Sequence, residues 1–281
     1  MERIVLGYDG SAASISALSW VADRAGREAA KVGLVNVVSR LAQDRTLGID
    51  QLVEAETILR ERAPGVVVEL HRLEGSVAGS LSDFSAQADL LVVGINPGHP
   101  IRAALAGAVP LRISTQARAP VVMVPTGWVD VGDPVTVGIT DDDSSRTALV
   151  FAASEAADTR RSLRLVHAWL MPTPSFTGNA VLAVSTDEVM AEHGAIMSAA
   201  AKWAQNRHPA MPVHSELVRD SRSAALLRFA PRSSLLVIGS DHHSVLGGSL
   251  LGSVAEGVLW HAECPVAVVP RDALIAHGRE E

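Results

Sequence analysis

The chain has 281 residues, of which 48% are hydrophobic and 20% charged, so it is long enough for one large domain or for two small domains with separate cores. A net charge of -7 and an aromatic content of 4% argue against a surface that binds DNA or RNA, although both are compatible with a small nucleotide pocket. The longest apolar runs are broken by Gly, Pro or charged residues well before the roughly 20 residues that a bilayer requires, so we expect no membrane contact.

Short apolar strands alternate with amphipathic helices through the first 125 residues. The run that ends at Gly7 and the run that ends at Gly94 are typical of parallel strands buried on both faces. Ser11 or Ser14 is expected to cap the first helix. Strands are predicted at 4–7, 32–38, 66–70, 90–93 and 120–125, and helices at 11–29, 52–62, 77–87 and 110–116. This alternation indicates an α/β fold with a parallel sheet.

The same series of elements begins again at Val135, which indicates an internal duplication. Early matches are separated by 131 residues, and later ones by 145, so 14 extra residues fall in 171–183 and in a longer helix after them. Ser185 and Glu188 have the spacing of a capping box for that helix. The matching pairs include Gly7 with Gly138, Asn36 with His167, and Gly94 with Gly239.

The segment 126–133 is the predicted boundary, because Pro125 ends a strand and two glycines loosen the chain after it. We therefore expect domains at 1–128 and 133–281. Each domain ends in an apolar strand, VVMVP or VAVVP, that would lie at the edge of its sheet. Since exposed apolar edges pair readily, the two final strands are predicted to meet across a pseudo-twofold axis.

The stretch 235–270 reads as strand, glycine-rich loop, helix and strand. Gly248 and Gly252 precede Ser253, which opens the helix that continues through Val254. A helix N-terminus with free N–H groups beside a strand end is a natural phosphate site. The same residue pattern is also typical of a tight turn in which Ser253 is only an N-cap. A phosphate site and a simple turn therefore both remain possible interpretations.

In order along the chain, these motifs resemble those of tandem universal stress proteins of actinobacterial type. The resemblance rests on the strand followed by Gly-x-Asp-Gly-Ser, on LRLVHAW, on LLVIGS with LLGSV, and on HAECPVAVVP, and it covers nearly the whole chain. It implies two tandem Rossmann-like domains, each a five-stranded parallel sheet of order 3-2-1-4-5 flanked by helices. It also implies a crevice between strands 1 and 4 in which many members bind ATP without robust catalysis.

The resemblance implies an Asp after strand 1 for the base and ribose, and a Gly-x2-Gly-x9-Gly-Ser/Thr loop for the phosphates. The first half keeps Asp9, but Pro97 replaces the second glycine of the loop and Pro110 removes a nearby N–H. Loss of these donors weakens a phosphate site. The residues assigned to this site are Gly7, Asp9, Val38, Gly94, Gly98, Gly107 and Ala108.

The second half keeps the loop glycine and hydroxyl but has Thr140 in the position of the Asp. Asp141 either substitutes for it or belongs to a solvated acidic turn. Asp241 would repel a triphosphate unless a divalent ion such as Mg²⁺ intervened. The residues assigned here are Gly138, Thr140, Asp141, Gly239, Ser240, His242, Gly248, Gly252, Ser253 and Val254.

The sequence thus predicts a regulatory protein of stress response that binds ATP, with or without Mg²⁺, at partly degenerate sites. The alternative is a protein-interaction scaffold that has lost ATP, and a homodimer or a regulatory protein partner are both left open. No enzyme is expected, since the chain has no Gly-x-Ser-x-Gly elbow. Cys264, the single cysteine, is expected to be a packed thiol in a cytoplasmic protein, and His167 a core histidine.

Overall fold

The computed structural model describes residues 1–38, 47–97, 108–171, 175–177, 180–182, 185–240, 253–273 and 275. The strands are β1 (Glu2–Gly7), β2 (Ala30–Val38), β3 (Val67–Glu74), β4 (Leu90–Ile95), β5 (Val121–Pro125), β6 (Val135–Gly138), β7 (Leu163–Trp169), β8 (Ser175–Thr177), β9 (Ala180–Leu182), β10 (Val213–Arg219), β11 (Leu235–Ser240) and β12 (Val266–Pro270). The α-helices are α1 (Ala12–Ala25), α2 (Leu47–Arg62), α3 (Val77–Phe84), α5 (Ala108–Gln116), α6 (Asp143–Asp158), α7 (Thr186–Arg207), α8 (Arg222–Leu227) and α9 (Ser253–His261).

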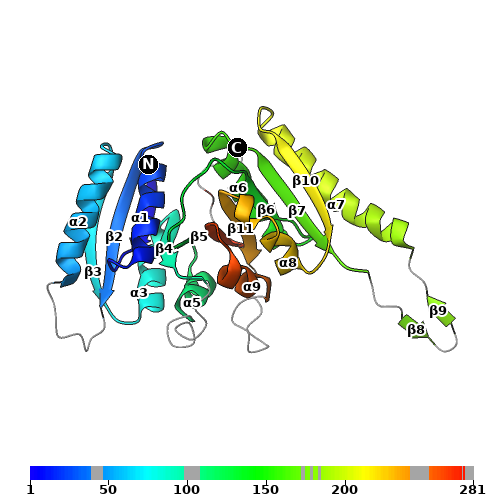
Figure 1. Cartoon of the computed structure of the whole chain (residues 1–281), viewed down its shortest axis with the longest axis horizontal. Helices are drawn as coiled ribbons and strands as arrows, with labels where there is room; N and C mark the ends of the chain where they lie inside the picture. Colours follow the sequence, from blue (N-terminus) through cyan, green and yellow to red (C-terminus); the bar gives the residue numbers. More distant parts are fainter. Residues whose placement is uncertain are drawn as a thin grey trace.

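One sheet runs through both halves of the chain, in the order β10-β7-β6-β11-β12-β5-β4-β1-β2-β3 (Figure 1). Within each half the neighbouring strands are parallel, and the order matches the 3-2-1-4-5 arrangement that the resemblance implies. The halves join where β5 and β12 pair antiparallel, with Val122 opposite Ala267. The prediction that the two final strands pair is therefore confirmed.

Helices cover both faces of the sheet and make a three-layer α/β fold. Alternate residues of β1 point to opposite faces, so Ile4 and Leu6 pack in one core cluster and Val5 in the other. The first cluster includes residues of α1, α2, α6 and α7, and the second includes residues of α3, α5, α8 and α9. Burial on both faces explains why the central strands are continuous apolar runs.

Polar side chains define where several helices begin. Ser11 accepts a hydrogen bond from the N–H of Ser14 at 3.2 Å, and Asp142 accepts one from the N–H of Ser145 at the same distance. These two caps occupy matching positions of the repeat. Ser185 also stands at the N-cap of α7, but its side chain makes no capping hydrogen bond, so the predicted capping box is wrong.

Several elements differ in length from the prediction: α1 ends at Ala25 instead of 29, while α2 and β3 extend well beyond their predicted bounds. Helix α2 begins at Leu47 instead of 52, and β3 continues to Glu74 instead of ending at 70. Strand β3 is at the edge of the sheet and largely accessible to solvent, so its second part carries charged residues that hide the strand pattern. Of the inserted segment, the described parts of β8 and β9 pair antiparallel and lie apart from the main sheet (Figure 1).

Cys264 lies just before β12 and is 2% exposed. Burial raises the pKa of its thiol to about 12, so the thiolate is disfavoured at neutral pH. The packed thiol is as expected. Within the described residues, no helix combines the length and the apolar character needed to cross a bilayer.

Gly194 lies inside α7, where an added Cβ would meet no atom within 4 Å. We expect Gly194→Ala to raise the free energy of unfolding by about 0.5–1 kcal/mol, because alanine loses less backbone freedom in a helix. Urea unfolding measures the change. Gly257→Ala in α9 is the matched control, since its Cβ would lie 3.1 Å from the Cβ of Ser223. Equal gains in both variants would contradict the explanation.

Candidate functional site

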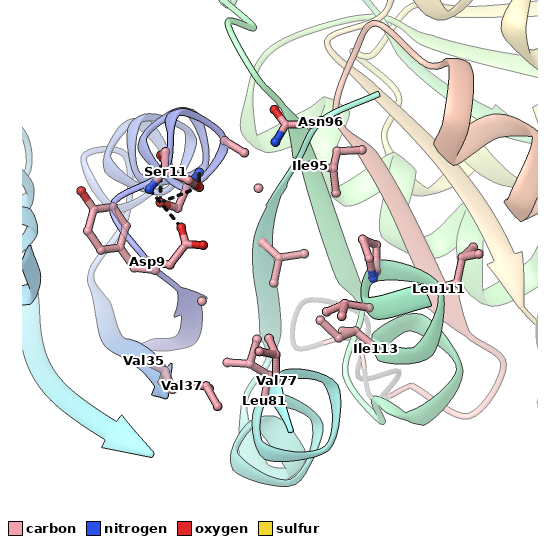
Figure 2. A pocket seen from close by; sticks show the side chains of 18 of the residues that line it. Asp9, Ser11, Val35, Val37, Val77, Leu81, Ile95, Asn96, Leu111 and Ile113 are labelled. Carbon is pink, nitrogen blue, oxygen red and sulfur yellow. Dashed lines mark hydrogen bonds between the residues drawn. The ribbon is translucent and has the colours of Figure 1, made fainter. Parts of the chain in front are cut away.

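A cavity of about 550 Å³ opens at the carboxyl ends of β1 and β4. This is where open α/β sheets bind ligands, because the strand order changes direction between these two strands. Figure 2 shows its walls, in which Asp9 and Ser11 lie on one side and Leu111 and Ile113 of α5 on another. The sequence assigned this crevice to a ligand, and the volume is in the range of small-molecule pockets.

Asp9 is the acidic side chain among the described residues that line the cavity. Its carboxylate Oδ1 accepts a hydrogen bond of 3.0 Å from the N–H of Ser11. Burial alone raises the pKa of Asp9, but hydrogen bonds from Ser11 and Ser14 outweigh it and leave the pKa below its ordinary value. The carboxylate is therefore ionised at neutral pH and can accept hydrogen bonds from N–H or O–H groups of a ligand.

Gly94 is required by a close approach of helix α1. A Cβ at this position would lie 2.2 Å from the carbonyl carbon of Ala13 and 2.6 Å from the nitrogen of Ser14. Gly239 is equally close to α6, at 2.4 Å from the carbonyl oxygen of Ser144. Both glycines thus let the first turn of a helix pack against the end of a strand. This packing requires glycine whether or not a ligand is bound.

Helix α5 supplies an apolar wall of the cavity. Val109, Pro110 and Leu111 line it, and the proline has no N–H to donate. Among the described residues that line the cavity, none is Lys, Arg or His. In the described part of the chain, no cluster of three or more His, Cys, Asp or Glu side chains is arranged to hold a metal ion. The described part of α5 that faces the cavity is thus an apolar wall.

The model of the universal stress protein family matches residues 1–125 and 133–270. The chain belongs to this family. A universal stress protein of Mycolicibacterium smegmatis is 28% identical over 288 residues, which cover 95% of this chain and 96% of the relative. One from Mycobacterium tuberculosis is 27% identical over 292 residues, covering 94% and 96%. The resemblance seen in the sequence is confirmed.

A crystal structure of a universal stress protein from Archaeoglobus fulgidus has the same fold. Its TM-score is 0.69 at 18% sequence identity, and the match covers 96% of each chain. A structure from Pseudomonas aeruginosa, described as a functionally unknown protein, matches with a TM-score of 0.66 at 18% identity, over 99% of this chain and 95% of that one. Similarity at this level shows the shared architecture and does not assign a ligand.

In the second half of this universal stress protein, the turn after β6 is organised as a helix cap. The N–H of Thr140 donates to Oγ of Ser145 at 3.0 Å, and Asp142 caps α6. Asp143 pairs with Arg271, while Asp141 is exposed. The turn has the features of the solvated acidic turn, so a ligand role for Thr140 and Asp141 remains a prediction.

His167 occupies the position that Asn36 holds in the first half, and the two side chains make matching contacts. Asn36 Nδ2 donates to the carbonyl of Tyr8 at 2.9 Å, and His167 Nδ1 lies 2.7 Å from the carbonyl of Ile139. Since the carbonyl can only accept, Nδ1 carries the proton and Nε2 accepts from Nδ1 of His193, 2.7 Å away. Burial lowers the pKa of His167, so it is a neutral core histidine, as predicted.

The remaining assigned residues are only partly described. Val38 is absent from the described lining and its neighbour Val37 is present, since successive side chains of a strand point to opposite faces. Ser240 ends β11 with a buried Oγ that has no hydrogen-bond partner among the described residues, and Val254 is partly buried near the start of α9. Ala108 and Ser253 begin α5 and α9. Gly98, Gly107, His242, Gly248 and Gly252 lie outside the described residues.

Apart from Gly7, Asp9 and Gly94, the sequence did not assign the described residues that line the cavity, and Ser11, Asn96, Leu259 and Trp260 are among those it missed. Ser11 could have been predicted from the sequence, because an N-cap directly after a strand end faces the ligand crevice. Leu259 and Trp260 could not have been predicted from the sequence, since they belong to the second half and reach the cavity only through the pairing of β5 with β12.

Proposed function

We propose that this universal stress protein is a regulatory protein that binds an adenine nucleotide in the cavity of its first half and does not act as an enzyme. The observation that carries the proposal is the ionised Asp9 at the wall of a cavity of about 550 Å³ at the switch point of the sheet. We also propose that 1–128 and 133–281 are its two domains, and that the protein acts in the cytoplasm.

The walls of the cavity match the parts of an adenosine group. Asp9 can accept hydrogen bonds from ribose hydroxyls or from an amino group, and Val35, Val37 and Leu81 provide apolar contacts for a flat ring (Figure 2). Beyond the sugar, phosphates would extend toward the start of α5. ATP, with or without Mg²⁺, is the ligand that the family resemblance implies, and the second half is a further site for its phosphates.

Binding is favoured over catalysis because the described lining places no serine beside a histidine base. Ser11 and Ser14 are engaged in capping α1 and in hydrogen bonds to Asp9 or to each other. A serine nucleophile requires an adjacent general base in hydrogen-bonding range, and the cavity's described residues include no histidine. A nucleotide that is bound without a nucleophile and a base stays intact and can act as a regulatory signal. A homodimer or a protein partner would then respond to its presence.

Replacing Asp9 by Asn tests the proposal. We expect the affinity for adenosine, AMP and ATP with Mg²⁺ to fall by about 10- to 150-fold, as expected for loss of one or more hydrogen bonds to a charged acceptor. Isothermal titration of the full chain measures it. Asp83→Asn is the matched control, because Asp83 is exposed on α3 and absent from the described lining.

An affinity of Asp9→Asn equal to that of the native chain would show that the ligand is held elsewhere. If the native chain released no heat with any of the three ligands at millimolar concentration, the proposal would fail. The scaffold that has lost ATP would then be the better description, and Pro110 at the start of α5 would be its structural basis.

A further inference from the structure

Two histidines from different elements meet where helix α7 packs on strand β7. His167 of β7 is 4% exposed, and His193 of α7 is partly buried. Nε2 of His167 lies 2.7 Å from Nδ1 of His193, while Nδ1 of His167 is held by the carbonyl of Ile139. A hydrogen bond between two titratable rings therefore joins the helix to the sheet.

The hydrogen bond between the rings limits how many protons the pair can hold. With Nδ1 of His167 donating to a carbonyl, the bond needs one donor and one acceptor among the two facing nitrogens. A first added proton can be accommodated, because a cationic ring can donate to a neutral ring across the same bond. A second proton places N–H groups on both facing nitrogens and two positive charges on rings whose centroids are 4.9 Å apart. The doubly protonated pair must separate.

The groups around His167 act in both directions on its charge. Burial is the largest cause that lowers the pKa of His167, and the charges of His193 and Arg222 lower it as well. The hydrogen bond to Ile139 and the charge of Asp141 act in the opposite sense, and the net pKa is below the ordinary value of 6.5. The fold therefore favours the neutral ring. This contribution to stability is fully present above pH 6.5 and is lost as the pH falls below it.

Two neighbouring elements bring arginines close to the pair. Arg222 begins α8, and Arg219 ends β10 with its guanidinium carbon 5.6 Å from the ring centroid of Trp169. The ring of Trp169 lies 5.8 Å from that of His193, centroid to centroid. A second positive charge on the two histidines would add to these cations, which increases the repulsion that separates the rings.

His193 lies where α7 changes from a packed to an exposed helix. After it, Met197 and Ala204 are buried and Trp203 packs against the core cluster. Before it, Val189 is the buried residue of a helix that the structure describes in full, and Figure 1 shows this end of α7 extending toward β8 and β9. Separation of the two histidines would thus free the first turns of α7, while the later turns remain packed on the sheet.

We propose that the pair of His167 and His193 is a pH-sensitive switch that holds the start of α7 on the sheet at neutral pH and releases it in acid. The released form takes up a second proton that the closed form excludes. Each pH unit below the range in which free histidine titrates therefore favours release by up to about tenfold. The switch lies in the second half and is independent of the nucleotide proposed for the first.

Hydrogen exchange of the full chain tests the switch, because amide protection reports local opening. We expect protection of the amides of residues 189–194, corrected for intrinsic exchange rates, to fall about tenfold between about pH 7.5 and about pH 5. The amides of α6 are the internal reference, and their protection is expected to change less than about threefold. An equal loss in α6 would show general acid destabilisation and would overturn a local switch.

Three variants separate the pair from other histidines. The change with pH should disappear in His167→Asn, because Asn does not titrate and Asn36 makes the matching bond to a carbonyl in the first half. In His193→Gln it should fall to about threefold or less, since a lone cationic His167 can still donate to the glutamine oxygen. His208→Gln is the matched control: burial lowers the pKa of His208 too, but this residue follows the other end of α7, so the native change should persist.

Comparison of the two pH values within each variant cancels any constant loss of stability that the substitution causes. A native chain whose protection at 189–194 is the same at both pH values has no such switch. A full tenfold change that persists in His193→Gln would assign the effect to burial of His167 alone and overturn the role of the pair. Loss of the change in His208→Gln would place the titrating group at the other end of the helix and equally refute the proposal.

Discussion

Replacing Arg24 by Met is expected to lower the free energy of unfolding by about 3–5 kcal/mol, because it leaves two buried carboxylates without their cation. Arg24 Nη1 lies 2.6 Å from Glu155 Oε2, and its Nε and Nη2 lie 2.9 and 2.8 Å from the two carboxylate oxygens of Glu2. The side chains of all three residues are at most 11% exposed. The two carboxylates outweigh the effect of burial and raise the pKa of Arg24.

Urea unfolding at neutral pH measures this loss. Lys31→Met is the control, since the ion pair of Lys31 with Glu69 is exposed to solvent and is expected to contribute little to stability. A loss below about 1 kcal/mol in Arg24→Met would show that the triad contributes no more than a surface pair.

The position of the triad in the repeat gives it a second consequence. Positions 24 and 155 are 131 residues apart, which is the offset of the duplication, and they carry opposite charges. In two identical copies, equal charges would face each other at this contact. Divergence to Arg24 in one half and Glu155 in the other therefore favours pairing of the two different halves over pairing of like halves.

Replacing Gly94 by Ala is expected to cost about 3 kcal/mol or more, because the added Cβ would lie 2.2 Å from backbone atoms of Ala13. Backbone at the start of α1 cannot move aside as a flexible side chain would. Gly65→Ala is the control, since its Cβ would meet no atom within 4 Å. Urea unfolding compares the two variants.

The matching position of the repeat provides an independent check of this prediction. A Cβ at Gly239 would lie 2.4 Å from the carbonyl oxygen of Ser144, so Gly239→Ala should also be destabilised strongly. If Gly94→Ala and Gly65→Ala had equal stabilities, the close approach of α1 to β4 would not constrain the fold. The glycines would then be better explained by contact with a ligand.

Local patterns predicted most of the architecture. Apolar runs ending at Gly7 and Gly94 identified buried parallel strands, and the recurrence of these motifs 131 to 145 residues later identified the duplication. Strand β3 was predicted too short because an edge strand has solvent on one side and carries charge. The capping box at Ser185 was wrong because spacing alone does not orient a side chain.

The amino-acid sequence by itself determined the family, the two-fold repeat and the position of Asp9 after the first strand. These depend on residues that are close together in the chain or that recur in the same order in both halves. Only the tertiary structure decided that Trp260 lines the first-half cavity and that Arg24 meets Glu155. Such contacts join residues more than a hundred positions apart, and they exist because pairing of β5 with β12 brings the two halves together.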